Sequence, residues 1–168
     1  MAELLILRLI HILGGLFWVG AGLFSTFFLG PSLKAAGPAV AGPVMNNLQK
    51  RRMFTVLPIV ALLTILSGAR LMWIVSAGDS HWFIHRAGHT YTASGALAII
   101  AFLTSLLVAR PAMVKAGKLA QSGASDGTSK EMLAAEMARL QRRGALSTAI
   151  ATTFLLLAAA GMAIARYL

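Results

Sequence analysis

Long stretches of this chain carry only apolar and small side chains, without the alternation of polar positions that is typical of a half-buried strand. The stretches free of Lys, Arg, Asp and Glu are 9–33, 53–69, 87–109 and 144–165. About 20 apolar residues suffice for a helix to cross a bilayer, and a backbone in lipid must satisfy its own hydrogen bonds. We therefore predict four membrane-spanning helices, near 4–29, 54–77, 82–109 and 145–167.

Two long connections follow the first and the third of these predicted helices. Turn signals predict that the connections 30–53 and 110–144 open at Gly30-Pro31 and Arg110-Pro111. Within the second connection, apolar residues recur at helical spacing over 133–140. We interpret this segment as an extension of the fourth helix, the alternative being an amphipathic helix that lies on the lipid surface.

Composition supports the same class of protein. Hydrophobic residues make up 58% of the 168 residues and charged residues 12%, against about 25% charged residues in a soluble domain. So little polar surface excludes a soluble enzyme and a disordered chain, and the absence of Cys excludes a disulfide scaffold. The predicted fold class is all-α: an integral membrane, antiparallel four-helix bundle that forms one transmembrane domain over 1–168.

The positive charge is concentrated in the two connections. Connection 30–53 holds Lys34, Lys50, Arg51 and Arg52, and connection 110–144 holds Arg110, Lys115, Lys118, Lys130, Arg139, Arg142 and Arg143. Both connections lie on one side of a four-span protein, and the positive-inside rule places them in the cytoplasm. We therefore predict extracytoplasmic termini and a multi-pass protein of the cell's inner (plasma) membrane. The net charge of +10 then reflects topology and attraction to anionic lipid, not a nucleic-acid partner.

Several ionisable residues occur in or beside the predicted spans, where such residues are rare and point to function by default. They are Arg8, His11, Arg70, His81, His85, Arg86 and His89. By the topology above, all of them belong to the outer half of the protein. At about 1.5 Å per residue, His11, Arg70 and His89 each lie about 10 Å below the outer surface.

The arginines in this half lack carboxylates within the spans. The nearby acidic residues, Glu3 and Asp79, both lie outside the predicted spans. An Arg at membrane depth without a carboxylate predicts a bound anionic group, such as haem propionates or a lipid phosphate. Two other interpretations stay open: Arg8 could extend to the outer surface, and Arg70 could bond to helix carbonyls or water.

The histidines suggest ligands. His81, His85 and His89 follow one another at intervals of four residues, so they would form one stripe if the third helix began at His81. A pair at this spacing can chelate a metal ion, and a neutral imidazole can be an axial haem ligand. The other interpretations are a solvated loop for these three residues and a purely structural role for His11.

One segment carries a resemblance to known families. Residues 9–20, LIHILGGLFWVG, resemble the first helix of the copper-resistance CopD-like membrane proteins, the related DUF2269-type proteins and the HemJ-type protoporphyrinogen oxidases. The pair Ser67-Gly68 is similar to a later part of that pattern. The resemblance implies a helical membrane bundle with His11 as a haem or metal ligand. The HemJ pattern also has a functional Lys in the third helix, whereas 87–109 contains no Lys.

The first functional hypothesis is a haem b site in the extracytoplasmic half of the bundle. His11 and His89 would be the axial ligands, and Arg8 and Arg70 would neutralise the propionates. The protein would then transfer electrons to a redox partner or act as a haem-linked oxidoreductase.

Two alternatives remain. In the second hypothesis, His81, His85 and His89, joined by His11, bind copper or zinc, for which imidazole is a suitable ligand. In the third, the chain is a non-catalytic structural subunit of a larger membrane complex or a homo-oligomer, and its small residues pack against a partner in the lipid bilayer.

Overall fold

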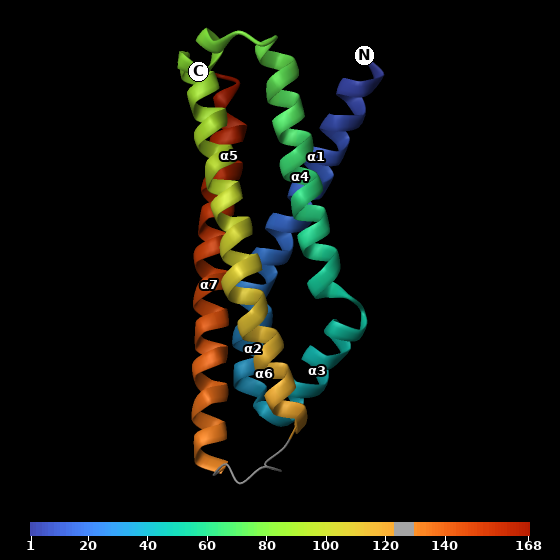
Figure 1. Cartoon of the computed structure of the whole chain (residues 1–168), viewed down its shortest axis with the longest axis vertical. Helices are drawn as coiled ribbons and strands as arrows, with labels where there is room; N and C mark the ends of the chain where they lie inside the picture. The colour runs from blue at the N-terminus through green and yellow to red at the C-terminus, as the bar shows by residue number, and fades with distance from the viewer. Residues whose placement is uncertain (123–129) are drawn as a thin grey trace.

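A computed structural model describes residues 1–122 and 130–168, and almost all of these residues are helical (Figure 1). The α-helices are α1 (Ala2–Phe24), α2 (Gly30–Ala36), α3 (Pro38–Lys50), α4 (Met53–Ser76), α5 (Arg86–Thr104), α6 (Arg110–Ser122) and α7 (Lys130–Ala165). Two π-helical turns, η1 (Ser25–Leu29) and η3 (Ser105–Ala109), and the 3-10 helix η2 (Ser80–Ile84) complete the elements. The all-α fold is confirmed.

Four helical segments are long and apolar enough to cross a membrane, as predicted. They are Ala2–Ala36, Met53–Ser76, Arg86–Leu119 and Glu131–Ala165. Many of their large apolar side chains are exposed, for example Leu16, Leu66 and Leu107, and a bilayer would cover such side chains. The chain is therefore a multi-pass membrane protein that contacts lipid.

Two of these segments run further than the sequence predicts. The first continues through Gly30-Pro31 and the third through Arg110-Pro111, because a π-turn ends two residues before each proline. In these turns the N–H of Gly30 bonds to the carbonyl of Ser25, and the N–H of Arg110 bonds to the carbonyl of Ser105. A wider turn relieves the clash between a proline ring and the preceding turn. The fourth segment confirms that 133–140 extends the last helix.

The third span begins later than predicted. Residues 80–84 form η2, His85 is extended (φ −66°, ψ 152°), and α5 starts at Arg86 rather than at 82. The cause is the turn that ends α4, where Ala77 and Gly78 both have positive φ. That turn leads into η2, which lies against the first turn of α5: a Cβ at Gly88 would collide with the carbonyl oxygen of Trp82.

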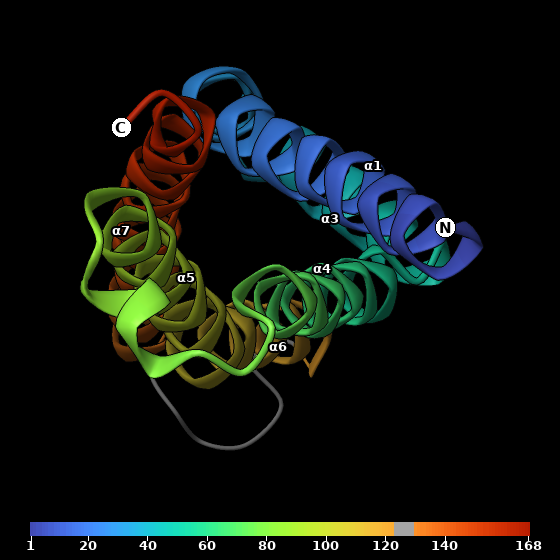
Figure 2. The same cartoon turned by 90° about the horizontal axis from the view of Figure 1, so that it is seen from above.

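The helices associate as two pairs. α5 makes its most extensive contact with α7, and α1 makes its most extensive contact with α4. The two views show the N-terminal end of α1 lying well away from α5 and α7 (Figures 1 and 2). The two chain termini lie at one end of the molecule, and α2, α3 and α6 lie at the other (Figure 1).

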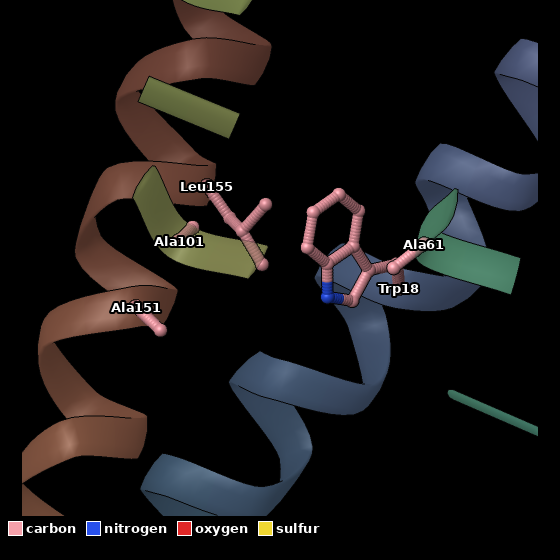
Figure 3. Close-up of a cluster of buried hydrophobic side chains, with 5 residues drawn as sticks. All are labelled: Trp18, Ala61, Ala101, Ala151 and Leu155. Atoms are coloured by element: carbon pink, nitrogen blue, oxygen red, sulfur yellow. The ribbon is translucent and has the colours of Figure 1, made fainter. Parts of the chain in front are cut away.

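Trp18 joins the two pairs. Its side chain on α1 is only 7% exposed and packs with Ala61 of α4, Ala101 of α5, and Ala151 and Leu155 of α7. Figure 3 shows the indole filling the space between these helices. Three alanines at the facing positions leave room for one large ring, which is how helices without a hydrophobic driving force pack closely in lipid.

Candidate functional site

The candidate site lies where α1 crosses α4. His11 is half-buried on the face of α1 that packs against α4, and its Nδ1 atom lies 2.8 Å from the main-chain carbonyl oxygen of Thr64. A carbonyl oxygen can only accept a hydrogen bond, so Nδ1 must carry the proton and donate it. In the neutral ring, Nε2 is then the nitrogen with the free lone pair.

Gly68 makes this position of the ring feasible. A Cβ at residue 68 would lie 2.6 Å from Cε1 and 2.9 Å from Nδ1 of His11, closer than such atoms approach. It would lie 3.6 Å from Nε2, so Nε2 is the ring nitrogen further from Gly68. Gly68 therefore serves as a recess for the imidazole, and any side chain there would displace it.

The surrounding hydroxyl groups are already satisfied. The hydroxyl of Ser67 donates to the carbonyls of Leu63 (2.7 Å) and Thr64 (3.0 Å), and the hydroxyl of Thr64 donates to the carbonyl of Val60 (2.8 Å). Within 1–122 and 130–168, no buried side-chain nitrogen or oxygen lacks a hydrogen-bond partner. The recess is thus a pre-organised support, and Nε2 is its available chemical group.

This geometry unites the two parts of the sequence that carry the family resemblance. His11 and Gly14 belong to the segment 9–20, and Gly14 abuts the Thr64 side chain. Ser67 and Gly68 form the second part, and Gly68 meets His11 of the first part across the contact between α1 and α4. Sequence reasoning missed Thr64, since a main-chain acceptor has no residue-specific signal.

Arg70 has a carboxylate partner, contrary to the prediction. Its Nε and Nη2 atoms lie 2.9 Å and 2.8 Å from Oε1 of Glu3, and the two side chains are 49% and 59% exposed. Glu3 reaches Arg70 because the start of α1 packs against the end of α4, so Arg70 needs no bound anion to neutralise it. Arg8 is exposed and forms no ion pair within the described part of the chain.

The other three histidines do not gather around His11. His81 lies in η2, where its backbone N–H bonds to Asp79 (2.9 Å), His85 precedes α5, and His89 lies on α5. All three are exposed. The condition for one helical stripe, a third helix that begins at His81, is not met because α5 begins after His85. Among the residues that the structure describes, no three His, Cys, Asp or Glu residues lie close enough to hold a metal ion.

His11 and His89 also stand on helices that diverge. α1 and α5 meet at the level of Trp18 and Phe102, whose rings pack edge to face with centroids 6.3 Å apart. Towards the end that carries the chain termini, α1 leans away from α5 (Figures 1 and 2). The site that remains is therefore a single imidazole on the pair α1–α4.

Comparison with known proteins adds no identification. No protein-family model matches the chain, and no similar curated protein or solved structure is found.

Proposed function

We propose that this protein binds haem b in the membrane through His11 and transfers electrons near the extracytoplasmic surface. The observation that carries the proposal is the hydrogen bond of 2.8 Å between Nδ1 of His11 and the carbonyl of Thr64. Histidines that bind metals usually donate their other ring N–H to such an acceptor, which fixes the tautomer and the orientation of the ring. Bound haem would supply one-electron chemistry at its iron.

The donor set favours haem over copper or zinc. A zinc site usually takes three or four protein ligands. Among the described residues, His11 belongs to no group of three His, Cys, Asp or Glu side chains that could hold a metal ion. Haem brings four equatorial nitrogen ligands of its own, so one imidazole is sufficient on the protein side. In this proposal His11 would bind the haem iron, and His89 has no such role.

One cation near His11, Arg8, is placed to bind a haem propionate. Arg8 precedes His11 by three residues, so the two share one side of α1, and Arg8 is exposed and unpaired in the part of the chain that is described. Arg70 is less suited, since Glu3 already neutralises it. We assign to Arg8 the role of binding a carboxylate.

The orientation in the membrane is part of the proposal. We infer an antiparallel arrangement with α2, α3 and α6 in the cytoplasm and both termini outside. The support is the positive-inside rule, together with the location of the termini at the end opposite those helices (Figure 1). His11 then belongs to the outer half, where it could exchange electrons with an extracytoplasmic partner.

The test compares the absorption spectra of three purified proteins expressed with ample haem: the natural chain, His11→Asn and His89→Asn. The amide of Asn has an N–H near the position of Nδ1, so His11→Asn can keep the bond to Thr64 while losing the ligand atom. We expect a Soret band in the natural chain and in His89→Asn, and a loss of haem affinity of at least about tenfold in His11→Asn.

Two results would overturn the proposal. One is a natural chain without a Soret band, which would favour a structural subunit. The other is equal haem content in His11→Asn, which would make His11 only a contact between α1 and α4. Thermal unfolding of the three proteins in detergent controls for misfolding. We expect the unfolding temperature of His11→Asn to be close to that of the natural chain.

A further inference from the structure

The end of the molecule opposite the termini carries a groove between α6 and the first part of α7. The groove has a volume of about 360 Å³. Its apolar wall includes Leu107, Val108 and Leu140, and its polar wall includes Lys115, Glu136, Arg139 and Arg143. Beside the groove, Arg142 and Leu146 line an open surface of α7 together with Arg139 and Arg143.

The groove is amphipathic along the direction of the helices. Leu107 and Val108 belong to the charge-free stretch 87–109, which is in the hydrocarbon region if α5 spans the membrane. The cationic residues come after this stretch on α6 and before the charge-free stretch 144–165 on α7. The groove therefore crosses the boundary between lipid and water, with apolar side chains at one end and cations at the other.

The residues that line the groove and the surface beside it carry more positive than negative charges. The carboxylate of Glu136 accepts a hydrogen bond from Nζ of Lys115 (3.1 Å). It also forms a longer ion pair with Nη1 of Arg139 (3.5 Å). Lys115 and Arg139 hold the pKa of the Glu136 carboxyl, on the part of α7 before its charge-free stretch, below its usual value. Arg142 and Arg143 are exposed and form no ion pair within the residues described. The groove thus offers unpaired guanidinium groups at the level of lipid headgroups.

We propose that this groove binds one anionic phospholipid, with the headgroup phosphate on the unpaired Arg142 and Arg143 and an acyl chain along Leu107 and Val108. Guanidinium groups bind phosphate oxygens bidentately, and basic pockets between helices at the cytoplasmic surface are suited to anionic headgroups. The apolar wall requires a ligand with a hydrocarbon chain, which a soluble phosphate lacks. This site depends on the membrane location and is independent of haem.

The test measures the rise in unfolding temperature of the detergent-solubilised full chain on adding phosphatidylglycerol, phosphatidylcholine or inorganic phosphate. The groove variant, Arg142→Gln/Arg143→Gln, removes the two unpaired charges and leaves the ion pairs of Glu136 intact. The matched control, Lys50→Gln/Arg51→Gln, removes two exposed charges from the end of α3. We expect stabilisation by phosphatidylglycerol alone, with affinity about tenfold weaker in the groove variant and unchanged in the control.

Every other outcome overturns the site. Equal weakening in the control would indicate diffuse attraction to the basic surface. Equal stabilisation by phosphatidylcholine would indicate a response to lipid in general, and stabilisation by inorganic phosphate would indicate an anion site without an acyl chain. If the groove variant unfolds without lipid at a much lower temperature than the natural chain, the single variant Arg143→Gln replaces it, and we again expect weaker binding of phosphatidylglycerol.

Discussion

The imidazole of His11 on α1 donates from Nδ1 to the main-chain carbonyl of Thr64 on α4, across 2.8 Å. The bond joins two helices and at the same time determines which ring nitrogen is available to a ligand. Its rigidity comes from α4, since the ring lies in the recess at Gly68, and the Thr64 carbonyl also accepts from Ser67. A contact that stabilises the fold therefore also orients a chemically active group.

Replacing Gly68 with Ala tests this recess. The new Cβ would lie 2.6 Å from Cε1 of His11, so the ring must leave α4 and its bond to Thr64 is lost. Overpacking of this kind costs about 1–3 kcal/mol of unfolding free energy, which thermal unfolding in detergent measures. Gly20→Ala is the matched control, because a Cβ at Gly20 meets nothing within 4 Å. Equal stability of Gly68→Ala and Gly20→Ala would contradict the recess.

Trp18→Ala should weaken the whole bundle. The indole is 7% exposed and packs with residues of α4, α5 and α7, so its removal leaves a cavity where the two helix pairs meet. Truncation of a buried Trp costs about 3–5 kcal/mol, and titration with a denaturing detergent should give a much earlier midpoint. Trp73, which is 63% exposed, provides the control. A comparable loss in Trp73→Ala would show that Trp18 has no special place in the core.

The ion pair between Glu3 and Arg70 should contribute little stability. Both side chains are about half exposed, and exposed pairs are worth at most about 1 kcal/mol. A double-mutant cycle with Glu3→Gln and Arg70→Gln should therefore give a coupling free energy below about 1 kcal/mol that decreases as salt is added. A coupling of several kcal/mol that salt leaves unchanged would mean that lipid shields this pair from water.

The membrane helices could be predicted from sequence because apolar runs are local, whereas their ends depend on neighbours. The helix continues past Pro31 and Pro111 because a π-turn precedes each proline, and the hydrophobic pattern carries no signal for such turns. The delayed start of α5 follows from the positive φ angles of Ala77 and Gly78. That start separates His81 and His85 from the helix on which a histidine stripe was expected.

The sequence likewise identified the central residue of the site but not its partners. An imidazole inside an apolar run draws attention to His11, but its acceptor is a main-chain atom that every residue possesses. Glu3 was missed as the partner of Arg70 because their meeting depends on how α1 crosses α4. That crossing depends on close contacts such as Gly14 against Thr64 and Gly68 against His11, which one-dimensional spacing does not reveal.

The orientation of the chain can be read with single cysteines, since the natural sequence contains no Cys. Ser80 in η2 and Ser32 in α2 are both exposed. Ser80 follows α4 at the end of the molecule that carries the chain termini, and Ser32 lies at the opposite end (Figure 1). With the basic segments inside the cell, a maleimide that does not cross membranes should label Ser80→Cys in intact cells. Ser32→Cys should react only after permeabilisation. The reverse pattern would move His11 to the cytoplasmic half and its redox partner to the cytoplasm, while leaving the imidazole, its bond to Thr64 and the groove at Arg143 intact.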